Sequence, residues 1–124
     1  KLAMLARLIS TGTLLKQGYL FWDEPETNLN PRLIKTLAVA IIAVATSGVQ
    51  VFIATHSLFL LRELEMLLEE TRHRKLARCW FALAAQGDTI VLEQSERIED
   101  IQTLVMLDEE LAQSDRFMQA GDGQ

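Results

Sequence analysis

Two adjacent carboxylates near the start of the chain are the residues best suited to chemistry. Asp23 and Glu24 follow the apolar run 19–22 directly, and a turn containing Pro25 comes next. Four large apolar residues in a row predict a fully buried strand that delivers both acids to one edge of a sheet. Adjacent side chains leave a strand end on opposite sides, so one carboxylate could hold a hydrated Mg²⁺ while the other faces an attacking water. The sequence therefore predicts a metal and nucleotide site at this edge.

His56 is the third candidate, because it follows a second apolar stretch. Residues 49–54 are mostly β-branched or apolar and predict another buried strand. A helix connects the two predicted strands, which makes them parallel. Parallel strands carry functional residues at their carboxyl ends, so we expect Asp23, Glu24 and His56 to converge on one edge. Each signal alone is weak, and the spacing of all three supports the hypothesis.

The elements that must position these residues follow from periodicity and capping. Asn30 before Pro31 predicts the start of a helix over 31–46, and Gly48 predicts its left-handed cap. Ser57 can cap the next helix. The expected elements are a first helix over residues 2–9, strands over 19–23 and 49–54, helices over 31–46 and 58–70, a hairpin of strands over 77–84 and 89–93, and a final helix over 97–112.

Length and composition indicate one globular domain. The chain has 124 residues, of which 49% are hydrophobic and 23% are charged. Its net charge of -5 provides no overall basic field that would attract nucleic acid. The single Cys79 excludes an internal disulfide and is expected to be a buried structural thiol in a protein of the reducing cytoplasm. No apolar run approaches the roughly 18 residues of a membrane span.

Three consecutive motifs resemble those of ABC-type ATPase heads. Residues 19–24 look like a Walker B motif, 25–30 like a D-loop and 51–57 like an H-switch, in the order and spacing of that family. The amino-acid sequence of residues 23–31 is similar to that of the RecF/SMC-like group of AAA family ATPases, which act in DNA repair and phage defence. This resemblance covers about residues 1–60. The expected fold class is α/β: the C-terminal part of a P-loop NTPase (ABC-ATPase-like) fold, with parallel core strands, helices and a C-terminal antiparallel hairpin.

The resemblance implies a role for each matching residue. Asp23 would hold Mg²⁺, usually through water, and Glu24 would orient or deprotonate the hydrolytic water. His56 would contact the γ-phosphate of ATP. Asn28 and Asn30 would lie at the seam between two heads that sandwich the nucleotides, where transporter-type D-loops carry an Asp in place of Asn30. The implied activity is ATP binding and hydrolysis coupled to dimerisation, which needs a positioned water, a metal and donors to the γ-phosphate.

Two other motifs of such heads do not occur in this sequence. It contains no Gly-x-x-x-x-Gly-Lys-Ser/Thr phosphate loop and no Ser-Gly signature. We therefore expect residues 1–118 to be the C-terminal lobe of a head, with a frayed tail at 119–124, and we expect this stretch alone to bind ATP and Mg²⁺ weakly. The expected partners are the N-terminal half of the same head and a second head. Nucleic acid or an effector subunit would be reached through other regions, and no membrane is involved.

Two alternatives stay open at this point. The region could be a non-catalytic dimerisation or regulatory module that keeps an ATPase-like fold. The presence of both Asp23 and Glu24 argues against a loss of the catalytic residues. It could also belong to an ATPase subunit of an ABC transporter, although the amino-acid sequence of residues 26–31 differs from that of transporter D-loops.

Overall fold

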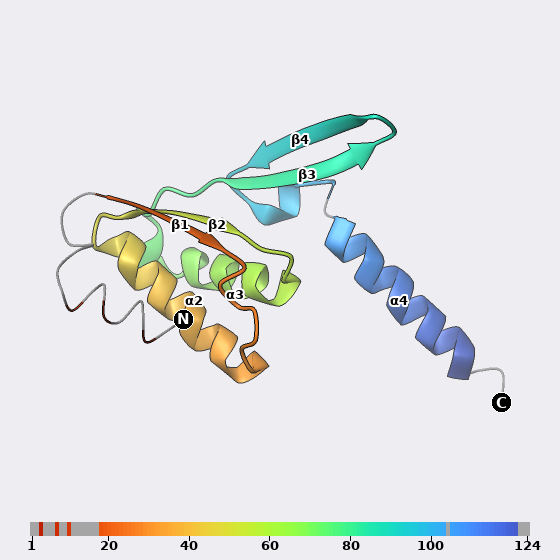
Figure 1. Cartoon of the computed structure of the whole chain (residues 1–124), viewed down its shortest axis with the longest axis horizontal. Helices are drawn as coiled ribbons and strands as arrows, with labels where there is room; N and C mark the ends of the chain where they lie inside the picture. Colours follow the sequence, from red (N-terminus) through yellow and green to blue (C-terminus); the bar gives the residue numbers. More distant parts are fainter. Residues whose placement is uncertain (1–2, 4–6, 8–9, 11–17, 104, 122–124) are drawn as a thin grey trace. The chain divides into compact units, whose positions relative to one another are not determined.

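The computed structural model describes residues 3, 7, 10, 18–103 and 105–121, which fall into two compact units (Figure 1). The helix predicted over residues 2–9 lies almost wholly outside the described residues. The first unit, Lys1–Ala77, contains β1 (Tyr19–Asp23), α2 (Pro31–Thr46), β2 (Gln50–Ala54), α3 (Leu58–Glu69) and the short 3-10 helix η1 (Thr71–His73). The second unit, Arg78–Gln124, contains β3 (Trp80–Gln86), β4 (Thr89–Ser95), the 3-10 helix η2 (Ile98–Asp100) and α4 (Val105–Gly121).

The strands of the first unit form a parallel pair. Tyr19 lies opposite Gln50 and Asp23 lies opposite Ala54, so β1 and β2 run in register over their whole length. The strands of the second unit form an antiparallel hairpin. This mixed α/β composition, with one parallel pair and one antiparallel hairpin, confirms the predicted pairing of both sheets. The prediction that residues 1–118 form one lobe of a larger head stays a prediction.

Helix α2 has the predicted bounds, and its caps explain them. The Asn30 side chain accepts a hydrogen bond from the Arg32 backbone N–H at 3.0 Å, and Pro31 occupies the first helical position, where its missing N–H costs nothing. After the helix, Gly48 has φ +97°, a left-handed conformation that favours glycine. The face of α2 turned to the core is apolar and buried, and it comprises Ile34, Leu37, Ala38, Ile41, Ile42 and Val44.

Only one face of the parallel pair is covered in the described part of the chain, which corrects the prediction of fully buried strands. Leu20, Trp22 and Val51 pack against a buried cluster formed by Val44 and Val49. The residues between them on each strand point the other way, because side chains alternate along a strand.

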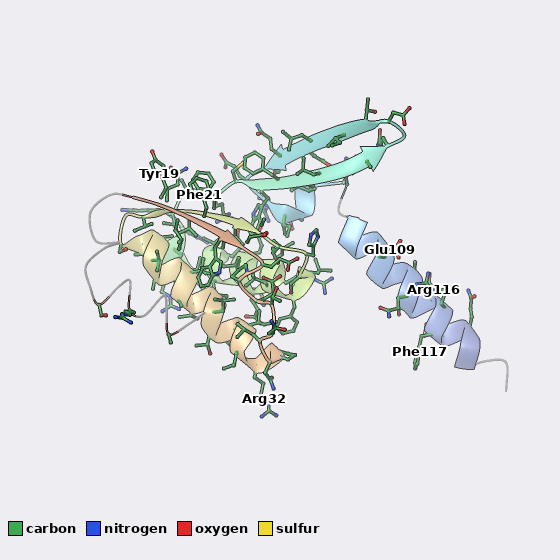
Figure 2. The ribbon with its side chains drawn as sticks, viewed as in Figure 1. Tyr19, Phe21, Arg32, Glu109, Arg116 and Phe117 are labelled. Carbon is green, nitrogen blue, oxygen red and sulfur yellow. The ribbon has the colours of Figure 1, made fainter. Side chains whose placement is uncertain are left out.

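The outer face of this sheet is aromatic. Tyr19 and Phe21 are 70% and 73% exposed, and Figure 2 shows both side chains along β1. Phe21 stacks on Phe52 with a centroid distance of 4.7 Å, and Tyr19 lies 6.3 Å from the same ring. Parallel sheets are usually covered on both faces, which explains why a buried strand was predicted and why the outer side chains are apolar.

Helix α3 completes the first unit by packing against α2. The Ser57 hydroxyl oxygen accepts from the Leu60 backbone N–H at 3.2 Å, which confirms the predicted cap. The buried side of the helix comprises Leu58, Leu60, Leu64, Leu67 and Leu68. Of the described helices, none combines the length and the hydropathy needed to cross a bilayer.

The hairpin of the second unit is shifted toward the C-terminus relative to the prediction: its strands cover 80–86 and 89–95, whereas 77–84 and 89–93 were expected. It turns at Gly87, whose φ of +60° suits glycine, and Trp80 pairs with Ser95 at its open end. Cys79, just before β3, is exposed, so the prediction of a buried thiol was wrong. The residues around Cys79 in the sequence are apolar, but Cys79 lies before the first residue of β3 and its side chain is exposed.

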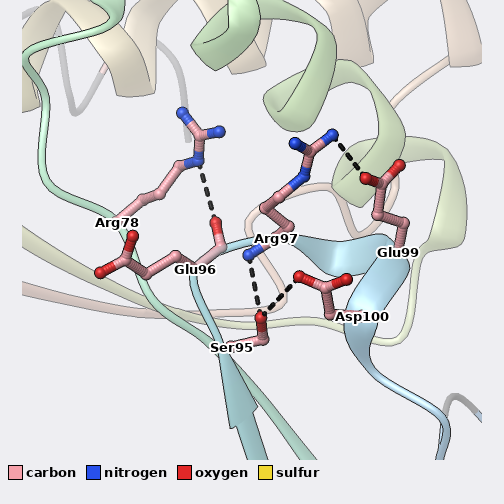
Figure 3. Close-up of polar contacts among 6 residues, drawn as sticks. All are labelled: Arg78, Ser95, Glu96, Arg97, Glu99 and Asp100. Carbon is pink, nitrogen blue, oxygen red and sulfur yellow. Dashed lines mark hydrogen bonds and ion pairs between the residues drawn. The ribbon is translucent and has the colours of Figure 1, made fainter.

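The final helix begins later than predicted. Residues 97–103 form η2 and a short connection, and α4 runs from Val105 to Gly121, through positions expected to fray. Local side-chain bonds compete with helix formation here. The Ser95 hydroxyl accepts from the Arg97 N–H at 3.2 Å and contacts Asp100 Oδ2 at 3.4 Å, while the side chain of Arg97 pairs with Glu99 (Figure 3).

The base of the hairpin is tied to this connection by two further groups. Arg78 Nε donates to the Glu96 carbonyl at 3.0 Å (Figure 3). The Glu93 carboxylate accepts from the Thr103 hydroxyl at 2.6 Å and from the backbone N–H groups of Gln102 and Thr103, each at 3.0 Å. These hydrogen bonds lower the pKa of Glu93 below its ordinary value, and the bond from the Thr103 hydroxyl has the largest effect. A carboxylate therefore holds the segment that leads into α4.

Candidate functional site

The carboxyl ends of β1 and β2 meet at one edge of the parallel sheet. Asp23 is the last residue of β1 and lies opposite Ala54, the last residue of β2. One residue later, the Glu24 backbone N–H donates to the Ala54 carbonyl at 2.8 Å. This bond extends the ladder one residue beyond β1, so the segments that begin at Glu24 and at Thr55 leave the same edge of the sheet, as the sequence predicted.

The two acids have different surroundings. Asp23 is exposed, whereas Glu24 is partly buried and its Oε2 accepts a hydrogen bond from the Thr27 hydroxyl at 3.0 Å. Glu24 also has φ +42°, which is uncommon for a residue with a side chain. Such a conformation costs about 1–3 kcal/mol and persists only where the surroundings impose it. The turn that follows therefore has to hold Glu24 in this conformation.

The turn after Glu24 is a compact double turn. The Thr27 N–H donates to the Glu24 carbonyl at 3.1 Å, and the Leu29 N–H donates to the Glu26 carbonyl at 2.9 Å. Pro25 is fully buried and anchors the turn. Asn28 is exposed and has φ +65°, a conformation that Asn tolerates better than most residues.

Asn30 is exposed at the far end of this turn, where its side chain caps α2. Its side-chain Oδ1 already accepts from the Arg32 backbone N–H, which leaves the side-chain NH₂ group as a donor. Asn28 and Asn30 both belong to the turn, but the described contacts bring neither to Asp23 or His56.

His56 is exposed and lies between two residues that fix the backbone. The Thr55 hydroxyl accepts from the Ser57 N–H at 3.0 Å, and the Ser57 carbonyl accepts from the Leu61 N–H at 3.1 Å as α3 begins. His56 is therefore held at the junction of β2 and α3 with its imidazole open to solvent.

Two residues that sequence reasoning did not single out join the two segments. The Thr55 hydroxyl donates to Glu26 Oε1 across 29 positions of sequence. Glu26 is partly buried, and its Oε2 is shielded from solvent without a hydrogen-bond partner among the described residues. No sequence motif predicts this hydrogen bond. The sequence indicates only that a polar residue follows each of two adjacent parallel strands.

The donor set fits a hydrated Mg²⁺ held partly by phosphate, but not an ion caged by protein. Among the described residues, no group of three or more His, Cys, Asp and Glu side chains could hold a metal. Mg²⁺ in nucleotide sites keeps several waters and uses one or two carboxylates together with phosphate oxygens. Asp23, exposed at the strand end, meets that requirement.

Comparison with known proteins gives one family match. Residues 2–62 match the model described as "AAA domain, putative AbiEii toxin, Type IV TA system". The matched range includes β1, α2, β2 and every residue of the candidate site. No curated protein and no solved structure matches the chain. The match supports an AAA-type P-loop ATPase family, whose members bind ATP and Mg²⁺.

Proposed function

We propose that this region contributes the metal and water side of an ATP hydrolysis site in an ABC-type ATPase head of the RecF/SMC-like group. The observation that carries the proposal is the bond from the Glu24 N–H to the Ala54 carbonyl, which extends the ladder one residue beyond β1. It brings Asp23, Glu24 and the segment containing His56 to one edge, and the family match covers all of it.

Each side chain has a role that suits its position. Asp23, exposed at the strand end, binds a water of the metal. Glu24 accepts a hydrogen bond from Thr27 through Oε2, and its carboxylate orients the attacking water. His56, exposed on the neighbouring segment, donates a hydrogen bond to the γ-phosphate. When bound, Mg²⁺ supplies charge neutralisation for the phosphate oxygens.

The remaining parts of the site would come from other segments of polypeptide. We propose that the N-terminal half of the head supplies the phosphate loop and that a second head closes over the nucleotide at Asn28 and Asn30. Both residues are exposed on the turn after β1. The side-chain NH₂ group of Asn30 is suited to a neutral contact across that seam, because the side-chain Oδ1 caps α2.

The cellular role is proposed from the resemblance and from the description of the matched family. DNA repair, DNA maintenance and phage defence are the processes of the RecF/SMC-like group, and the description of the matched family, which names a type IV toxin–antitoxin system, adds a role in such a system. Such a role places the protein in the cytoplasm, with nucleic acid or an effector subunit bound by other regions.

The test is phosphate release by the purified full-length protein with ATP and Mg²⁺. The proposal expects steady-state hydrolysis by the wild type and its loss when Mg²⁺ is chelated. ATP binding and dimerisation with no hydrolysis under any condition would instead identify a non-catalytic module. A gene for a membrane-spanning partner beside this one, with hydrolysis stimulated by that partner, would indicate a transporter subunit.

A further inference from the structure

The Thr55 hydroxyl lies at a junction of three segments of the first unit. It donates to Glu26 Oε1 in the turn after β1, and it accepts from the Ser57 N–H at 3.0 Å at the start of α3. A hydroxyl has one donor and two acceptor positions, so this group uses its only proton on Glu26. Thr55 thereby links the end of β2 to a turn that is distant in sequence.

Glu26 is an effective anchor for this link. Its backbone carbonyl accepts from the Leu29 N–H at 2.9 Å, which fixes it within the double turn. A hydrogen bond to an ionised carboxylate is about twice as strong as one between neutral groups. The second oxygen, Oε2, is shielded from solvent without a partner among the described residues, which carries a desolvation cost.

The link lies beside both proposed reacting groups. Glu24 is two residues before Glu26, and His56 follows Thr55 directly. The bond from Glu24 N–H to Ala54 holds the two backbones together at the strand ends, and the bond from Thr55 to Glu26 closes the same gap further along. Two bonds at different points fix both the distance and the relative rotation of the two segments.

We propose that Glu26 and Thr55 are positioning residues for ATP hydrolysis, which set the separation between the Glu24 carboxylate and the His56 imidazole. This inference rests on the proposed function. Neither residue has a contact with the nucleotide in this proposal: both hold the groups that act on the attacking water and on the γ-phosphate. Their loss therefore lowers kcat and leaves the KM for ATP nearly unchanged, because a small misplacement of reacting groups can cost about 100-fold in rate.

The central variant is Thr55→Val in the full-length protein, which keeps the side-chain shape and removes the hydroxyl, and with it both the bond to Glu26 and the acceptor of the Ser57 N–H. We expect kcat to fall about 10- to 100-fold with little change in KM. Thr55→Ser restores the hydroxyl and should recover most of the rate. The matched control is Thr46→Val, which removes a hydroxyl bonded to the Ile42 carbonyl at 2.7 Å at the end of α2 and should leave kcat unchanged.

A double-mutant cycle tests whether the two residues act through one bond. Glu26→Ala alone should lower kcat to a similar degree, and adding Thr55→Val should cause little further loss. Independent, multiplicative losses would refute a shared role. Glu26→Ala also decides the question if Thr55→Val fails to fold, because it leaves the bond from Ser57 N–H to Thr55 in place.

The outcomes separate this inference from the proposed function. If the wild type does not hydrolyse ATP, or if Glu24→Gln hydrolyses it normally, the proposed function fails. If Glu24→Gln is inactive while Thr55→Val keeps the wild-type kcat, the positioning role alone is overturned. A Thr55→Ser variant as slow as Thr55→Val would also overturn it, because the hydroxyl would then not be the group that matters.

Discussion

Replacing Asn30 separates its structural role from its proposed place at the dimer seam. Its side chain accepts from the Arg32 N–H at 3.0 Å and is the N-cap of α2, whose first turn contains no acidic residue. Asn30→Ala removes this acceptor and leaves an N–H of the first turn to water. Asn30→Asp keeps the acceptor and adds a negative charge at the positive end of the helix dipole.

The two variants should change the free energy of unfolding in opposite directions. Loss of a cap costs about 0.5–2 kcal/mol, and an exposed position such as Asn30, where water replaces part of the bond, places Asn30→Ala near 1 kcal/mol. With a urea m-value of about 1–3 kcal/mol/M, the unfolding midpoint should fall by about 0.3–1 M. Asn30→Asp should match the wild type or exceed it by about 0.3–1 kcal/mol.

Tryptophan fluorescence can report on the first unit alone. The chain has two tryptophans, and Trp22 packs against the core of the first unit while Trp80 begins β3 of the second. In a Trp80→Phe background, urea unfolding followed at Trp22 measures the unit that contains α2. Equal midpoints for Asn30→Ala and the background protein would refute the capping role. A full-length Asn30→Asp protein that is stable but fails to dimerise would support the seam contact.

Two other predictions concern single titratable side chains. His56→Ala in the full-length protein should reduce steady-state ATP hydrolysis, whereas His73→Ala, the matched control on η1, should not; wild-type hydrolysis by His56→Ala would remove His56 from the site. The lowered pKa of Glu93 means that its contribution to stability is complete above its ordinary pKa of 4.5 and is lost as the pH falls through the lower value reached in the folded chain. Amide exchange protection at Gln102 and Thr103 should therefore decrease in acid, and Glu93→Gln should abolish that pH dependence; an unchanged acid profile in the variant would contradict the assignment.

The first unit could be predicted closely because its signals are local. Asn30, Pro31 and Gly48 mark the ends of α2 by capping chemistry, and the predicted bounds of 31–46 are confirmed. The apolar runs also predicted both parallel strands. The same runs predicted too much burial. A strand that is apolar on both sides is typical of a parallel sheet covered on both faces, whereas Tyr19 and Phe21 are exposed in the described part of the chain.

The start of α4 could not be predicted from periodicity. Ile98 and Ile101 fit a helical repeat, but the Glu93 carboxylate binds the N–H groups of Gln102 and Thr103, and Ser95 binds that of Arg97. Side-chain bonds that arise from the fold of the hairpin thus override a local pattern.

For the candidate site, the sequence predicted the convergence of two strand ends but not the bond that locks them. The parallel direction of β1 and β2 follows from the helix between them, so the meeting of their carboxyl ends could be foreseen. The pairing of Glu26 with Thr55 depends on the course of the turn after β1, including the positive φ of Glu24, which no spacing rule determines.

The most direct test of the central claim is the rate of γ-phosphate release from ATP bound to full-length Glu24→Gln protein. Gln keeps the shape of the side chain and an oxygen for the Thr27 hydroxyl, but it cannot take a proton from water. ATP binding should match the wild type while release of phosphate becomes undetectable, and the control Glu63→Gln on α3 should hydrolyse normally. Phosphate release at the wild-type rate by Glu24→Gln would contradict the account.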